Sequence, residues 1–171
     1  MKDVSVPKVG FSAKELGDDD LILLRVEIEK EINKRGIKFS VGEVGEKMAI
    51  KFFNETPGLS NLISAAAGAK NVDALSRDGD RYTIKTVQKA KKTGTIYPDS
   101  KEKKKQLFEF LLLVNLDEDY NLKAIYRFSW EQFDKEKAWD KRMNAWYIPF
   151  SSNRLKNCEI LFQKEKSKNE K

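Results

Sequence analysis

The chain of 171 residues contains no histidine. This absence excludes a Ser-His-Asp triad, a Cys-His nucleophile, histidine metal ligands and a histidine pH switch. Because Cys158 is the single cysteine, neither an intrachain disulfide nor a cysteine-based zinc cluster can form. We expect Cys158 to be a small, buried, apolar residue. Any enzymatic chemistry must therefore come from carboxylates, lysines, hydroxyls and a hard metal ion.

The chain also lacks a long apolar run. The longest such run has five residues, 110–114, whereas a membrane-spanning helix needs about 20. The N-terminal residues show no apolar core of a secretory signal. These absences predict a cytoplasmic protein with no membrane partner. The net charge of +6, from 33 basic and 27 acidic residues, permits a polyanionic partner without requiring one.

Length and charge pattern predict a single domain over 1–163, followed by a charged, disordered tail over 164–171. A helix is expected over 18–34, because acids stand at its start and basic residues at its end. A second helix is expected over 40–54, where Ser40 begins a capping sequence. The apolar face of the first helix is formed by Leu21, Leu24, Ile28 and Ile32.

Apolar and β-branched runs between turn-forming residues predict the strands. These strands span 71–76, 81–87, 108–115 and 122–128, with a further one near 159–162. Ser129 is expected to cap a helix that begins at Trp130. No regular structure is predicted over 57–70, and the aromatic-rich segment 138–162 is expected to be largely irregular.

Glu46 lies inside the apolar arc of the helix over 40–54. At 100° per residue, Glu46 falls between Phe53 and Ile50, whereas Glu43 falls on the narrow polar stripe. Buried acids are rare unless they are paired or bind a metal. Two interpretations stay open at this point: a snorkelling or salt-bridged Glu46, or a Glu46 that belongs to a site.

The loop of the first predicted hairpin decides which of its side chains share a face. A two-residue turn would place Asp73 and Lys85 on opposite faces. A three-residue loop with Gly79 in the left-handed conformation places Asp73 opposite Thr83 and puts Lys85 on the same face. We expect the three-residue loop, because it separates charged from apolar residues more cleanly. The alternative is an exposed hairpin face that bears ordinary charges.

The order and spacing of these motifs resemble the PD-(D/E)XK nuclease superfamily, and more closely its small type II restriction-endonuclease-like proteins. The resemblance covers residues 40–87, and the strands over 108–128 fit the next two strands of the family. It implies an α/β restriction-endonuclease-like fold, a mixed central β-sheet flanked by α-helices, with its core motifs over 40–128. The matching segments are Ser40-Val41-Gly42-Glu43-Val44-Gly45-Glu46, Asn71-Val72-Asp73-Ala74 and Arg81-Tyr82-Thr83-Ile84-Lys85-Thr86.

The resemblance also implies a metal-dependent site. Asp73 corresponds to the metal-binding aspartate, Lys85 to the catalytic lysine and Glu46 to the helix glutamate that completes the site. Thr83 stands where the family usually has Asp, Glu or Gln as a metal ligand, and nearby carbonyls or Glu109 are expected to compensate for its weaker hydroxyl donor. The implied cofactor is Mg²⁺, with Mn²⁺ as an alternative, because hard cations take oxygen ligands.

The implied function is a Mg²⁺-dependent DNA endonuclease that hydrolyses phosphodiester bonds of double-stranded DNA. A homodimer is expected, because both strands must be cut. One alternative is a non-catalytic DNA-binding relative of the same fold, marked by Thr83. The other is a structural or protein-interaction module that uses the same sheet.

A basic segment runs from Lys85 to Lys105 and contains eight lysines and two acids. It is interpreted either as an arm that contacts DNA phosphates or as a solvated, mobile loop. The aromatic residues around Trp139 and Trp146 are interpreted as core or as a base-reading or dimer surface. The lysines expected to contact DNA are Lys89, Lys91, Lys92, Lys103, Lys104 and Lys105.

Overall fold

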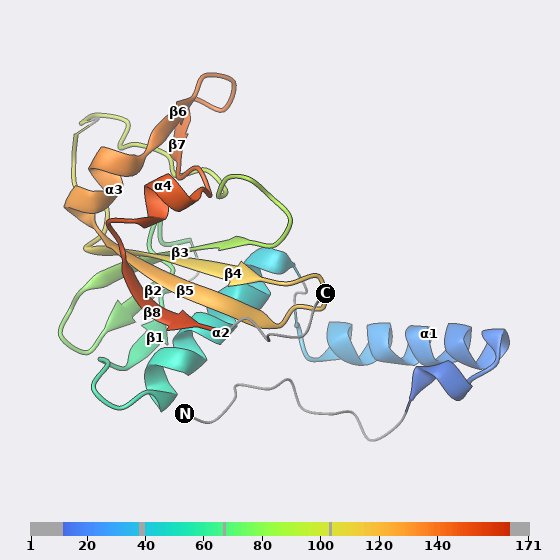
Figure 1. The fold of residues 1–171 in the computed structure, drawn as a ribbon. Helices are drawn as coiled ribbons and strands as arrows, with labels where there is room; N and C mark the ends of the chain where they lie inside the picture. The colour runs from blue at the N-terminus through green and yellow to red at the C-terminus, as the bar shows by residue number, and fades with distance from the viewer. Residues whose placement is uncertain (1–11, 38–39, 67, 103, 165–171) are drawn as a thin grey trace.

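A mixed six-stranded β-sheet forms the centre of the computed structural model, which describes residues 12–37, 40–66, 68–102 and 104–164. The strand order is β1-β2-β3-β4-β5-β8, and β6 and β7 form a separate ribbon (Figure 1). β3 and β4 are parallel, and the other neighbours are antiparallel. The strands are β1 (Leu62–Ser64), β2 (Ala74–Ser76), β3 (Arg81–Val87), β4 (Phe110–Leu116), β5 (Leu122–Ser129), β6 (Ala138–Asp140), β7 (Ala145–Tyr147) and β8 (Glu159–Gln163).

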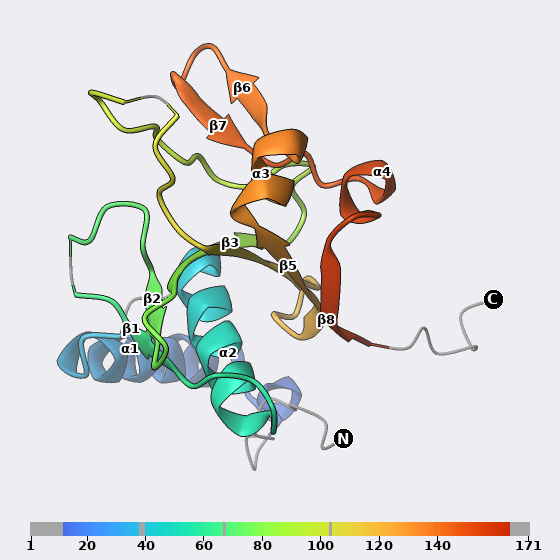
Figure 2. The same ribbon diagram turned by 90° about the vertical axis from the view of Figure 1, so that its left-hand side faces the viewer.

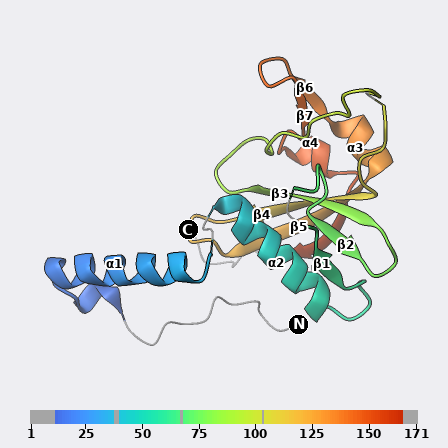
Figure 3. The same ribbon diagram turned by 180° about the vertical axis from the view of Figure 1, so that it is seen from behind.

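Helices lie on both faces of the sheet, so the chain has the mixed α/β architecture expected from the sequence. α2 (Val41–Glu55) packs on one face, whereas α3 (Trp130–Glu136), α4 (Ser152–Leu155) and the β6–β7 ribbon lie over the other (Figure 2). α1 (Asp18–Lys34) follows a 3-10 turn, η1 (Ala13–Glu15). It projects away from the sheet, as views from opposite sides show (Figures 1 and 3).

Two apolar layers hold these elements together. Along β4, Leu112 and Val114 pack on the α2 side, whereas Leu111 and Leu113 pack on the α3 side. All four are fully buried, as expected for a central strand covered on both faces, where apolar residues run continuously rather than alternate. The apolar run 110–114 is therefore the middle of the sheet.

α1 contributes nothing to either layer. No residue of this helix is buried, and the predicted apolar face of Leu21, Leu24, Ile28 and Ile32 packs against no core. None of the helices in the described ranges combines the length and apolar character that a membrane crossing requires.

Most predicted elements are present, with corrections where the backbone turns. The strand expected from residue 71 begins only at Ala74, because Asn71 has a positive φ of 61° and interrupts the extended chain. The segment over 57–70 contains β1, and the segment over 138–162 is more regular than expected, since it contains β6, β7 and α4. Of the expected tail, Lys164 donates its N–H to the Lys123 carbonyl, and the remainder lies outside the described residues.

Cys158 is half-buried against the α3-side layer. Burial raises the pKa of its thiol to about 11. Its Sγ donates to the Leu155 carbonyl at 3.1 Å. This thiol is thus protonated and unreactive at neutral pH, in line with a packing role.

Candidate functional site

A pocket beside the start of α2 is lined by four charged side chains, three of which the sequence predicts as site residues. Glu43 and Glu46 come from α2, Asp73 from the residue before β2, and Lys85 from β3. We call this hollow of about 520 Å³ the acidic pocket. It is also lined by Ser40, Val41, Gly42, Ile84, Thr86 and Gly94.

Asp73 lies where the backbone ladder between β2 and β3 ends. Its N–H donates to the Tyr82 carbonyl at 2.8 Å. Two residues further along β3, the Ile84 N–H donates to the Asp73 carboxylate, at 2.6 Å from Oδ2, rather than to a backbone carbonyl. A charged acceptor strengthens such a bond. The sheet edge therefore fixes the orientation of this carboxylate.

Two side chains of β3 reach the same oxygen. The Thr83 hydroxyl donates to Asp73 Oδ2 at 3.1 Å, and Lys85 Nζ lies 3.5 Å from it. The Lys85 and Asp73 side chains are only 21% and 28% exposed, so this ion pair is screened less than a surface pair. Thr83 itself is fully buried and does not line the pocket.

The three-residue hairpin loop is confirmed by the register of β2 and β3. Ala74 pairs with Tyr82, which sets Asp73 opposite Thr83. Gly79 has a φ of +91°, a conformation that favours glycine. The sequence-based choice between the two loop lengths was therefore correct, and Asp73 and Lys85 share a face.

Close packing of α2 on β3 brings Glu46 to this pair. A Cβ on Gly45 would lie 2.0 Å from Thr86 Oγ1, so only glycine permits this approach. Glu46 is half-buried and forms no hydrogen bond or ion pair with any described residue. Burial raises the pKa of its carboxyl above the usual range, Asp73 and Glu43 add to the rise, and Lys85 opposes it. Among the described residues Glu46 has no ion-pair partner, so it is not the salt-bridged residue of the alternative interpretation.

Ser40 and Glu43 close the pocket at the N-terminus of α2. Ser40 Oγ accepts the Glu43 N–H at 3.2 Å and donates to Glu43 Oε2 at 3.0 Å. The positive end of the helix dipole faces the same region. The sequence places Glu43 on the polar stripe of this helix and does not assign it to the site. Its spacing of three from Glu46 is the signal that could have done so, because residues three apart are neighbours on a helix surface.

The donor set of the acidic pocket suits a hard divalent cation. Three carboxylates stand against one ammonium, and carboxylate oxygens are the ligands that Mg²⁺ prefers. Within the described ranges, no three acidic or cysteine side chains converge as a ready cage. Mg²⁺ does not need one, because it is usually held by one or two carboxylates together with water and substrate phosphates.

Glu109 does not compensate for Thr83, and this expectation is wrong. Its carboxylate forms a two-pronged contact with Arg81, with Arg81 Nη2 at 2.8 Å and Arg81 Nε at 3.0 Å. These hydrogen bonds hold the pKa of the Glu109 carboxyl below its usual range. Arg81 begins β3, four residues or about 13 Å along the strand from Lys85.

The basic segment is anchored rather than free. Ile96 exchanges two backbone hydrogen bonds with Trp146, at 2.8 and 2.9 Å, and Lys92 bridges to Pro149. Residues 92–96 are therefore held to the segment 146–149. The choice between a DNA-contacting arm and a mobile loop stays a prediction for the rest of the basic segment.

Several of the predicted DNA-contacting lysines already have acidic partners. Lys89 pairs with Glu118 at 3.2 Å and Lys92 with Asp140 at 2.8 Å. Lys105 lies 3.9 Å from Asp99. Within the described part of the chain, Lys91 and Lys104 form no ion pair, and Lys103 lies outside it.

No protein-family model matches the chain, and no curated protein matches it either. The resemblance to the PD-(D/E)XK nuclease superfamily therefore rests on the motifs over residues 40–87.

Proposed function

We propose that the chain is a Mg²⁺-dependent DNA endonuclease with a restriction-endonuclease-like fold. The observation that carries this proposal is the meeting of Glu46, Asp73 and Lys85 in one pocket, with Lys85 Nζ 3.5 Å from Asp73. The three residues come from three separate elements, and their types match those that phosphodiester hydrolysis requires without histidine.

Asp73 and Glu46 would hold the metal ion. Asp73 Oδ2 is occupied by Ile84, Thr83 and Lys85, whereas its Oδ1 has no hydrogen-bond partner among the described residues. Glu46 presents an unpaired carboxylate to the same pocket. When bound, Mg²⁺ would neutralise phosphate charge and acidify a bound water.

Lys85 and Thr83 have different roles in this proposal. The Lys85 ammonium orients the attacking water and offsets negative charge that develops on the phosphate. Thr83 orients Asp73 through its hydroxyl rather than serving as a metal ligand, because its side chain is buried away from the pocket. The usual acid at this position is then replaced by a positioning residue.

Double-stranded DNA is the proposed substrate, cut by a homodimer that provides one site for each strand. Lys91 and Lys104 are the better candidates for phosphate contacts, since Lys89, Lys92 and Lys105 would have to exchange an acidic partner for phosphate.

The proposal is tested by cleavage of plasmid DNA with Mg²⁺ or Mn²⁺. Asp73→Asn should abolish cleavage, because it removes a metal ligand. It should leave metal-free DNA binding unchanged or tighter, since like charges a few ångströms apart repel by about 1 to 4 kcal/mol. Lys85→Ala should also stop cleavage but should not tighten binding. Asp119→Asn, in the turn between β4 and β5, and Lys123→Ala, near the start of β5, are the matched controls.

Thermal melts establish that each variant is folded. A folded Asp73→Asn protein that cleaves at the wild-type rate contradicts the assignment. Metal-free DNA binding by a wild type that never cleaves would instead support the non-catalytic relative.

A further inference from the structure

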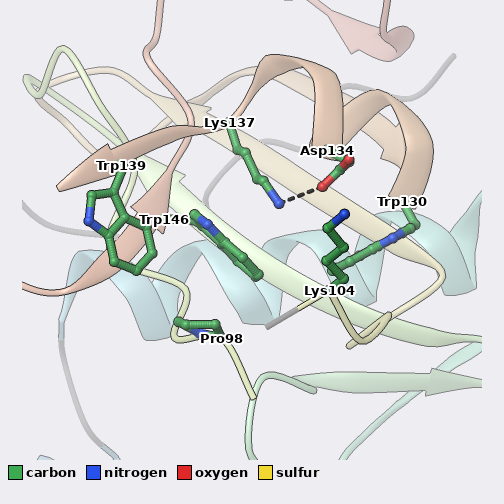
Figure 4. A pocket seen from close by; sticks show the side chains of 7 residues that line it. All are labelled: Pro98, Lys104, Trp130, Asp134, Lys137, Trp139 and Trp146. Atoms are coloured by element: carbon green, nitrogen blue, oxygen red, sulfur yellow. Dashed lines mark hydrogen bonds and ion pairs between the residues drawn. The ribbon is translucent and has the colours of Figure 1, made fainter. Parts of the chain in front are cut away.

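A second pocket lies over the opposite face of the sheet, beside α3 and the β6–β7 ribbon (Figure 4). Its volume is about 660 Å³, within the usual range for small-ligand sites. We call it the tryptophan pocket. The residues that give it its chemistry are Trp130, Trp139, Trp146, Lys104, Lys137 and Asp134.

The three indole rings form a row, with Trp146 between the other two. Trp146 contacts Trp130 and Trp139 edge-on, at centroid distances of 6.4 and 6.2 Å. Trp146 is only 8% exposed and belongs to the core, but Trp139 is 42% exposed. Packing therefore accounts for Trp146 and leaves the Trp139 ring surface open to a ligand.

The charges of the pocket select against a cationic ligand. Lys137 Nζ lies 3.7 Å from the centroid of the Trp146 ring and forms an ion pair with Asp134. The chain thus already fills the cation position of this aromatic cluster. Lys104 has no acidic partner within the described ranges, so two ammonium groups face one carboxylate. A ligand that is both flat and anionic fits this arrangement, and a nucleotide is both.

A short stretch of chain connects this pocket to the acidic pocket. Gly94 lines the acidic pocket, and Pro98 lines the tryptophan pocket. Four residues span at most about 14 Å. Between them, the Tyr97 carbonyl accepts a hydrogen bond from Asn71 Nδ2 at 2.9 Å, two residues from Asp73. A smaller hollow shares Pro98 and Trp139 with the tryptophan pocket. A single nucleic-acid strand can therefore reach both pockets.

We propose that the tryptophan pocket binds one unpaired nucleobase of a DNA strand whose backbone crosses the acidic pocket. The base stacks on Trp139, and Lys104 contacts an adjacent phosphate. This inference rests on DNA being the partner in the proposed function, but it does not depend on cleavage.

The test uses the full chain carrying Asp73→Asn, with EDTA, and measures fluorescence anisotropy of a short fluorescein-labelled oligothymidine. Adding Trp139→Ala should weaken binding by roughly 5- to 150-fold, the range for loss of one stacked base. Trp139→Phe should restore most of the affinity, since it keeps a stacking surface. Met143→Ala, an exposed apolar residue in the turn of the same ribbon but outside the pocket, is the matched control and should bind normally.

An abasic oligomer of the same length separates stacking from phosphate contacts. Trp139→Ala should not change its affinity. Equal losses for the abasic and the base-bearing oligomer, wild-type affinity of folded Trp139→Ala, or no binding of any oligomer would each overturn the inference. Binding that depends on Trp139 in a protein that never cleaves DNA would support the pocket and contradict the nuclease.

Discussion

α1 and α2 are similar in length, 17 and 15 residues, and both carry apolar residues at helical spacing. α2 buries Gly45, Ala49, Phe52 and Phe53 against the sheet, whereas α1 buries none of its residues. Ile22 and Leu23 of α1 are 62% and 64% exposed. One helix builds the core and the candidate site, and the other stands in solvent.

The arrangement of the apolar residues explains the difference. In α2 they share one wide arc, and Gly45 lets the helix backbone approach β3. In α1 they surround the helix, since Leu23 falls about 160° from Leu21 at 100° per residue. α1 is supported instead by the surface ion pairs Arg25–Glu29 and Glu31–Arg35, and such pairs contribute about 0.3 to 0.5 kcal/mol each. Apolar residues at helical spacing predict that a helix forms. Whether the helix packs on the sheet depends on two further features: the apolar residues must lie on one side, and small residues there must let the backbones approach.

The largest expected effect comes from deleting a core side chain of α2. Phe53 is 1% exposed and contacts Tyr82 edge-on. Phe53→Ala should lower the free energy of unfolding by about 3 to 5 kcal/mol. Leu23→Ala on α1 should change it by less than about 0.5 kcal/mol. Denaturant titration measures both, and a Leu23→Ala cost close to that of Phe53→Ala would break the contrast between the helices.

A smaller loss is expected where α2 touches β3. Gly45→Ala places a Cβ 2.0 Å from Thr86 Oγ1 and 2.6 Å from its Cγ2. The free energy of unfolding should fall by about 1 to 3 kcal/mol. Thr86→Ala should recover part of that loss in the double variant. Gly42→Ala is the control in the same helix, because its nearest atom lies 3.9 Å away; a loss of equal size there would mean that the contact with Thr86 is not the cause.

The smallest expected effect is the pH dependence of folding stability that Glu46 contributes. Its pKa is raised in the folded state from a usual value of 4.5, chiefly by burial. The folded state therefore binds this proton more tightly, and stability falls as pH rises above that value. Glu46→Gln removes the cost of burying an ionised carboxylate at this position. In EDTA, it should melt slightly above wild type at pH 7 and equally below pH 4. Glu27→Gln on α1 is the matched control, and identical melting shifts for the two variants would contradict a special environment at Glu46.

The local features of the fold were predictable from the sequence. Gly79 and the division between charged and apolar residues identified the hairpin register that sets Asp73 opposite Thr83. Ser129 and Gln132 form the capping box expected at the start of α3. Each of these predictions depends on residues only a few positions apart.

Features that depend on distant pairing were not predictable in the same way. The bridge between Ile96 and Trp146 joins segments 50 residues apart, and nothing in the local sequence of either one indicates the other. The ion pair of Glu109 with Arg81 likewise depends on the parallel register of β3 and β4. The tryptophan pocket and the anchoring of the basic segment follow from such contacts.

The parallel pairing of β3 with β4 also has a kinetic consequence. Antiparallel hairpins such as β2–β3 and β4–β5 close short loops, which form within microseconds, whereas β3 and β4 meet only after a much longer loop has closed. Asp73 and Lys85 both belong to the first hairpin region, so their ion pair can form early in folding. Glu46 joins them through the contact of α2 with β3, where Gly45 meets Thr86, 41 residues further along the chain, so we expect the complete acidic pocket to form after the ion pair.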